Sequence, residues 1–204
     1  MNYFITAIGT DSGKTLVSSI LVEALKADYW KPIQAGFPKD TDIVRQLVSN
    51  KSTKFHKEVY VLNTPASPHA AAEIDGVLID LREINMPCTE KNLIIEGAGG
   101  LMVPLNDQDF VIDIAKKMNC GVVLVCNMYL GSINHSLLSL SYLKAQNIAI
   151  KGIVFNGPGN PASEEIILKY AQAPCLLNIE QEKEINKEVV KHYAVQLKKN
   201  LNDE

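Results

Sequence analysis

Short apolar runs alternate with longer amphipathic stretches along this chain of 204 residues. The runs at 2–8, 28–33, 92–97, 121–127 and 149–156 are apolar almost throughout, as in strands buried on both faces of a sheet. Between them, helical spacing of apolar residues predicts helices over 16–27, 42–48, 110–119, 136–147 and 163–172, with a closing helix over 183–202. This alternation predicts βαβ units, and therefore an α/β fold with a doubly wound, mostly parallel sheet and helices on both faces.

Composition narrows the class of protein without naming a function. The length suits one α/β domain over residues 1–204, and no repeat or linker interrupts it. A net charge of −3 provides no basic footprint for nucleic acid. The four cysteines form no C-x-x-C pair, the N-terminus lacks a signal-peptide pattern, and no apolar run reaches membrane-spanning length. We therefore expect a reduced cytoplasmic protein that acts away from membranes.

Polar and glycine-rich segments follow the apolar runs. In doubly wound sheets the ligand crevice lies outside the carboxyl ends of the strands, so these segments carry the functional signal. They read GTDSGKT, KPIQAG, EGAGG, NMYLGSINH and NGPGN.

The segment GTDSGKT predicts a phosphate-binding loop. Gly13, Lys14 and Thr15 end it as in the P-loop pattern, and a helix follows at once. Backbone N–H groups of Asp11, Ser12 and Gly13 at this helix start would bind phosphate, Lys14 would lie along the β- and γ-phosphates, and Thr15 would hold Mg²⁺. The alternative is a tight turn in which Gly-Lys-Thr occurs by chance. It explains less well why a strand precedes this segment and a helix follows it.

A magnesium ion beside phosphates also takes one or two carboxylates. Glu96 ends an apolar strand and precedes three nearby glycines, which makes it the first candidate. Asp42 is a second candidate in the stretch KDTDIVRQL. Helix N-capping by Asp40 or Asp42 is an equally good interpretation of that stretch.

A second lysine, Lys31, ends the second apolar run beside Pro32. It could stabilise another anion or the charge that grows on a transferring phosphoryl group, or it could only cap a strand beside Trp30. Further along, Ser67 precedes Pro68 and is expected to cap a helix. Polar residues of GSINH could bind a carboxylate or cap the helix that begins there.

Taken together, these segments resemble the dethiobiotin synthase family. The matching stretches are AIGTDSGKT, KPIQAG, DTD, SPHAAA, EGAGGLMVPL, LGSINH and FNG, in the family's order and across about residues 2–156. The resemblance implies a homodimer of P-loop subunits that uses ATP to join 7,8-diaminononanoate and CO₂ into the ureido ring of dethiobiotin. One amine would become a carbamate, the γ-phosphate would convert it into a carbamic-phosphoric anhydride, and the second amine would close the ring.

The resemblance also implies roles for individual residues. Lys14, Thr15, Asp42 and Glu96 would serve the phosphates and Mg²⁺, with Lys31 beside the carbamate and γ-phosphate. A carbamate and a triphosphate are both anions, which explains the second lysine.

The resemblance also assigns residues to the sites for adenine, for the two amines and for the carboxylate tail of the substrate. Asn156 matches the residue that binds adenine, Asp11 faces the diamine or metal, and Ser67 and Gly99 line the diamine site. The carboxylate tail of the substrate would bind a segment of the neighbouring subunit, formed by Gly131, Ser132 and Asn134.

The chain departs from the family pattern at three positions. The family's loop is one residue longer than the common P-loop, so Ala7 stands at its first-glycine position. Whether Ala7 tolerates the backbone torsion that glycine would adopt there is an open question, and a strained or displaced Ala7 is the feature to look for. Asp11 replaces a frequent glutamate and is shorter, and Ala35 replaces a frequent serine.

Two other classes of P-loop protein compete with this interpretation. A cobyrinate amidase-like ligase needs an ammonia source, for which 204 residues leave no room. A nucleotide-switched ATPase of the partitioning type would act as a binding module, but such proteins usually place a lysine early in the loop. Residues 7–12 contain none, and Lys31 has no purpose in that class.

Overall fold

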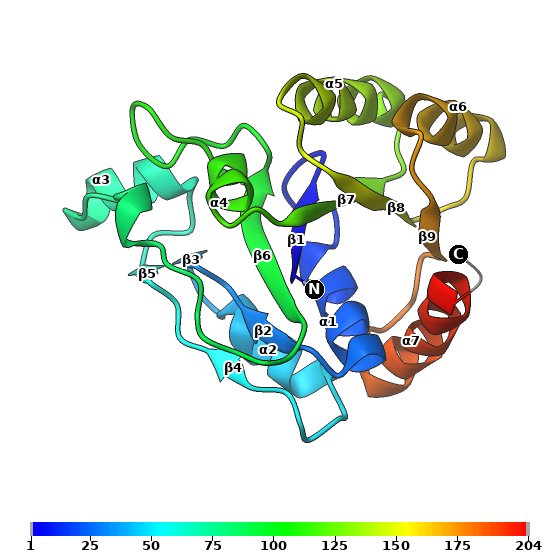
Figure 1. The fold of residues 1–204 in the computed structure, drawn as a ribbon, viewed down its shortest axis with the longest axis horizontal. Coiled ribbons are helices and arrows are strands. Elements are labelled where there is room, and N and C mark those ends of the chain that lie inside the picture. Colours follow the sequence, from blue (N-terminus) through cyan, green and yellow to red (C-terminus); the bar gives the residue numbers. More distant parts are fainter. Residues whose placement is uncertain (1, 203–204) are drawn as a thin grey trace.

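A computed structural model describes residues 2–202 of the chain (Figure 1). Its main sheet has seven parallel strands in the order β4-β2-β6-β1-β7-β8-β9. These strands are β1 (Asn2–Ala7), β2 (Asp28–Trp30), β4 (Phe55–His56), β6 (Leu93–Gly100), β7 (Gly121–Asn127), β8 (Ile150–Asn156) and β9 (Cys175–Ile179). A second, two-stranded parallel sheet pairs β3 (Ile33–Ala35) with β5 (Tyr60–Leu62).

Helices cover both faces of the main sheet (Figure 1). The helices are α1 (Lys14–Leu25), α2 (Asp40–Leu47), α3 (Pro68–Asp75), α4 (Val111–Lys117), α5 (Ser132–Ala145), α6 (Pro161–Ala171) and α7 (Lys187–Asn202). One face carries α4, α5 and α6, which pack on β6, β7 and β8, while α1 and α7 pack together on the other face. Over residues 2–202, no helix combines the length and the apolar character needed to cross a bilayer.

Alternate residues of the strands enter two separate cores. Phe4 and Ile95 belong to the core under α4, α5 and α6, whereas Ile5 and Ile94 belong to the core under α1 and α7. Successive strand residues point to opposite faces, so a strand covered on both sides must be apolar at every position. The predicted doubly wound α/β architecture is confirmed.

The apolar run at 28–33 does not form one strand. It divides into β2 and β3 at Lys31 and Pro32. The backbone carbonyl of Pro32 accepts hydrogen bonds from the N–H groups of Val59 and Tyr60 instead of continuing the main sheet. Lys31 therefore leaves the sheet at the point where its side chain can enter the cleft described below.

Several element bounds also differ from the prediction. Strands β4, β5 and β9 have two, three and five residues, too short for a clear periodic signal. Helix α5 begins at Ser132, in the GSINH segment where a helix start was expected and four residues before the apolar period that begins at 136, whereas α7 begins at Lys187 and not at 183. The left-handed Gly131 lets α5 start directly after the preceding turn.

Strand β1 lies between β6 and β7, so the chain moves outward from it in both directions. This is the switch point at which loops from neighbouring strands diverge and leave a crevice at their carboxyl ends. The loop after β1 and the end of β6 meet there.

Candidate active site

The crevice is a cleft of about 780 Å³ at the carboxyl ends of β1, β3 and β6. It brings together eight of the residues that the sequence indicated. They are Asp11, Gly13, Lys14, Thr15, Lys31, Ser67, Glu96 and Gly99. The phosphate loop forms one part of its wall, and the start of α3 at Ser67 and Pro68 forms another.

Ala7 is not strained. It is the last residue of β1, is buried, and keeps its register with Val125 of β7. The left-handed backbone falls instead on Asp11, with φ of 54°, and on Gly13, with φ of 93°. Aspartate tolerates this conformation better than most residues. Ala7 does not need a glycine torsion, because the loop turns four residues later.

The phosphate loop is braced from β7 and β8. The Asn156 carboxamide donates to the carbonyl of Ser12 at 2.9 Å, and the Ser12 hydroxyl donates to Oδ1 of Asn127 at 2.7 Å. A Cβ on Gly13 would overlap the Asn156 carboxamide, so only glycine fits there. Ser12 and Asn156 thus lie behind the loop and not in the cleft, and Asn127 is a bracing residue that sequence analysis missed.

Lys14 is almost enclosed, with 8% of its surface exposed. Its ammonium group donates to the carbonyl of Gly9 at 3.2 Å. Burial, followed by the positive charge of Lys31, lowers the pKa of Lys14 to about 8. A lysine that loses solvation in this way gains from any anion that enters the cleft.

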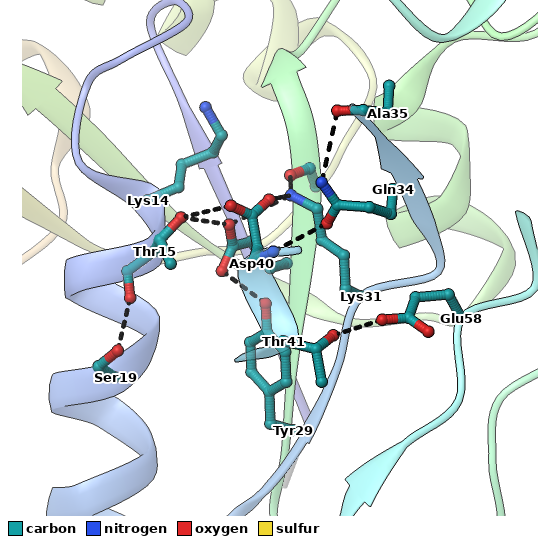
Figure 2. A network of polar contacts seen from close by, with 12 residues as sticks. Lys14, Thr15, Ser19, Tyr29, Lys31, Gln34, Ala35, Asp40, Thr41 and Glu58 are labelled. Atoms are coloured by element: carbon teal, nitrogen blue, oxygen red, sulfur yellow. Dashed lines mark hydrogen bonds and ion pairs between the residues drawn. The ribbon is translucent and has the colours of Figure 1, made fainter. Parts of the chain in front are cut away.

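Lys31 lies between two carboxylates (Figure 2). Its ammonium group is 2.7 Å from Oδ2 of Asp40 and 3.2 Å from Oε1 of Glu96, and it also donates to the carbonyl of Gly97 at 2.8 Å. Burial by itself would lower the pKa of Lys31, but the Glu96 and Asp40 carboxylates outweigh burial and raise the pKa. Lys31 therefore stays charged inside the protein.

The Thr15 hydroxyl contacts the same two carboxylates. It lies 3.0 Å from Oε1 of Glu96 and 3.2 Å from Oδ1 of Asp40. A hydroxyl has one proton and can donate to only one of them at a time. The positive charge of Lys31 is thus what holds the two carboxylates together.

Asp40, and not Asp42, joins this cluster. The Asp42 side chain is about half exposed and pairs with Arg45 at 2.5 Å, on the outer side of α2. Residues two apart on a helix point in nearly opposite directions, and Asp40 shares its face with the buried Val44 one turn later. The i, i+4 spacing to an apolar residue was the available signal for preferring Asp40.

Two polar contacts, one buried and one part-buried, set the orientation of α2 (Figure 2). Oε1 of Gln34 accepts a hydrogen bond from the backbone N–H of Asp40 at 3.0 Å. The Thr41 hydroxyl donates to Oε1 of Glu58 at 2.7 Å. Gln34 and Glu58 were also missed in the sequence, because nothing local links them to α2.

The oxygen atoms of this cluster suit a magnesium ion. Thr15, Asp40 and Glu96 present one hydroxyl and two carboxylates, which are hard donors of the kind Mg²⁺ prefers. Within the described part of the chain, no group of three or more His, Cys, Asp or Glu could hold a metal by itself. A small donor set agrees with an ion that keeps waters and binds substrate phosphates.

Three candidates near the start of α5 lie apart from the cleft. Gly131, Ser132 and Asn134 line a separate hollow of about 700 Å³ between the start of α5 and residues 158–163. Ser67, which lines the cleft, occupies the N-cap position of α3, and Pro68 is the first helical residue as predicted, but the Ser67 side chain makes no capping hydrogen bond. The Ser67 hydroxyl lies 3.2 Å from Nδ1 of His69.

Known proteins resemble this chain along most of its length. A family model described as an AAA domain matches residues 1–189. An ATP-dependent dethiobiotin synthetase of Cytophaga hutchinsonii is 55% identical over 197 residues, with 96% of each chain covered. Another, of Christiangramia forsetii, is 52% identical over 202 residues, covering 98% of this chain and 97% of its own.

The chain belongs to the dethiobiotin synthetase family. The resemblance of its motifs to this family, and the expectation of an enzyme of the ligase class, are confirmed.

Solved structures with the same fold are more distant in sequence. The septum site-determining protein MinD of Pyrococcus horikoshii, complexed with Mg-ADP, has a TM-score of 0.60 and 13% identity, covering 99% of this chain and 96% of its own. A ParA-family ATPase of Chlorobium tepidum has a TM-score of 0.57 and 12% identity, covering 99% and 97%. At these identities they show the P-loop α/β fold and nothing more.

Proposed function

We propose that this protein closes the ureido ring of dethiobiotin from 7,8-diaminononanoate and CO₂ at the expense of ATP. The observation that carries the proposal is the buried, charged Lys31 in the same cleft as Lys14 of the phosphate loop. Phosphate binding alone accounts for one lysine, whereas a reaction between two anions needs a second fixed positive charge.

The proposed reaction forms two C–N bonds to the carbon of CO₂. One amine adds to CO₂ and loses a proton, giving a carbamate. A carbamate oxygen then attacks the γ-phosphorus of ATP, and the bond to ADP breaks. The second amine attacks the carbamoyl carbon, loses a proton and expels phosphate, which carries away one oxygen of CO₂.

At the phosphate end, Lys14 and the backbone N–H groups around Asp11, Ser12 and Gly13 would bind the nucleotide. The start of α1 adds its helix dipole to these N–H groups. Asn156 would hold this loop in shape and, by resemblance to the family, would also contact adenine.

Thr15, Asp40 and Glu96 would hold Mg²⁺ beside the phosphates. Bound there, the ion would supply positive charge to the β- and γ-phosphate oxygens. Lys31 would orient the carbamate toward the γ-phosphate, and its contacts with both carboxylates keep its ammonium group at the floor of the cleft.

At the diamine end, Ser67, Gly99 and Asp11 would line the site for the two amines. All three face the cleft that holds Lys31. Gly99 has φ of 65°, a left-handed conformation that glycine adopts without strain.

The proposed assembly is a homodimer in which Gly131, Ser132 and Asn134 bind the carboxylate tail of the partner's substrate. Large apolar side chains are exposed on and near α5, which supports an interface there. They are Met102, Tyr129, Leu130, Ile133 and Leu138.

An omission assay tests the function. Protein, Mg-ATP, diaminononanoate and bicarbonate are combined, and each component is left out in turn while ADP and ureido product are measured. We expect stoichiometric ADP and product that require every component. ADP release without bicarbonate or product would instead support the partitioning-type ATPase, which no contact in the cleft favours.

A further inference from the structure

Tyr29 lies directly beneath the carboxylate and lysine cluster (Figure 2). It is fully buried in β2, and its hydroxyl donates to Oε2 of Glu96 at 2.9 Å. The other carboxylate oxygen of Glu96, Oε1, faces Thr15 and Lys31. The two oxygens therefore have separate partners, one in the core and one toward the cleft.

The sheet register explains why these side chains meet. Tyr29 is the partner of Ile94 in the β2–β6 pair, so both point to the same face of the sheet. Glu96 is two residues beyond Ile94 and points to that face as well, about 7 Å further along β6. A tyrosine side chain is long enough to span that offset, so its hydroxyl reaches the carboxylate from below.

The position of the hydroxyl is fixed by packing. The Tyr29 ring packs at a tilt against Phe55, with 6.1 Å between ring centroids. The Arg45 guanidinium lies 4.8 Å from the centroid of Phe55 and covers that ring. A carboxylate only accepts hydrogen bonds, so the Tyr29 hydroxyl is the donor of its bond to Glu96.

We propose that Tyr29 is a positioning residue that locks the Glu96 carboxylate so that Oε1 points at Thr15 and the metal position. The inference rests on the proposed role of Glu96 as a magnesium ligand. The terminal torsion of a glutamate is soft, and a hydrogen bond to one oxygen fixes where the other points. Partners that orient a ligand in this way usually change metal affinity by about 10- to 100-fold when removed.

The test uses Tyr29→Phe, which removes the hydroxyl and keeps the ring. Mn²⁺ serves as the probe, and its affinity for the ADP-loaded protein is measured by electron paramagnetic resonance. The matched control is Tyr193→Phe. Tyr193 is also a buried residue, and its hydroxyl donates to Glu182 at 2.7 Å and accepts from the N–H of Glu180 at 3.1 Å, away from the cleft.

We expect Tyr29→Phe to weaken Mn²⁺ binding about tenfold, as for other outer-shell partners. ADP affinity in EDTA should stay within about twofold, because the phosphate loop does not contact Tyr29. Tyr193→Phe should leave both affinities unchanged while it lowers thermal stability to a similar degree.

Three results would overturn the inference. They are a loss of Mn²⁺ affinity below about threefold, an equal loss in Tyr193→Phe, or a parallel loss of metal-free ADP binding. None of these measurements involves the diamine or ring closure. Failure of the proposed reaction would appear only in the omission assay of the wild-type protein and is therefore distinguishable.

Discussion

Raising the pH should weaken nucleotide binding through Lys14. The pKa of this lysine is lowered to about 8 by burial and by the charge of Lys31. Between pH 7 and pH 9 the charged fraction of Lys14 falls about tenfold, and affinity for metal-free ADP should fall by about the same factor. Near pH 8 the binding of each nucleotide should take up about half a proton, since the phosphates restore the charge.

The stability of the ligand-free protein should change in the opposite direction. The folded-state pKa of Lys14 lies below its ordinary value of 10.5, so the unfolded chain binds more protons between the two values. Stability then rises with pH across that window. From pH 7 to pH 9 the gain from Lys14 is about 1.3 kcal/mol, which corresponds to roughly 3–5 °C in Tm for a chain of this size.

Calorimetry with ADP in EDTA, in buffers of different ionisation enthalpy, measures affinity and proton uptake together. Scanning calorimetry of the ligand-free protein gives the stability trend. Lys14→Arg is the control, because its guanidinium stays charged throughout this range and should abolish both trends. An ADP affinity that is flat from pH 7 to pH 9, or that declines equally in Lys14→Arg, would refute the reasoning.

Three further predictions concern the carboxylate cluster and the dimer. Lys31→Met should reduce turnover by roughly 10²-fold while ADP still binds in EDTA, because a charge that acts on the reacting groups is lost. Near-normal turnover would show that Lys31 takes no part in the mechanism. Asp40→Asn should lower Mn²⁺ affinity, measured by electron paramagnetic resonance, by about tenfold or more, whereas Asp42→Asn should leave it unchanged. Equal effects of the two substitutions would contradict the orientation of α2. Leu138→Glu should convert dimers to monomers in analytical ultracentrifugation, because it puts a charge on the exposed apolar surface at α5. The control Leu78→Glu changes a leucine that is exposed elsewhere and should leave the dimer intact. If Leu138→Glu also leaves the dimer intact, the interface lies on another surface.

Part of the site could be predicted because its signals are local. Gly13, Lys14 and Thr15 join a buried strand to a helix. Glu96 follows the apolar residues of β6, although the strand itself runs on to Gly100 and does not end at Glu96 as expected. A position toward the carboxyl end of a buried apolar run is enough to bring such residues to one edge of a parallel sheet. These residues do line one cleft.

The missed residues act through contacts between distant parts of the chain. Tyr29 and Glu96 are 67 residues apart, and Ser12 and Asn127 are 115 apart. No local pattern marks such pairs, because their contact depends on which strands become neighbours and in what register. Tyr29 in particular looks like any other aromatic residue of an apolar run.

The sequence by itself determined the alternation of strands and helices, the phosphate loop and the family, because hydrophobic period and motif spacing are properties of neighbouring residues. Only the tertiary structure decided between Asp40 and Asp42, since the rotation of α2 depends on its contacts with Gln34, Glu58 and the core. It also placed the left-handed turn at Asp11 and left Ala7 extended, because Ala7 is held in the sheet beside Val125. Packing and strand register, which no short stretch of sequence contains, set these details of the site.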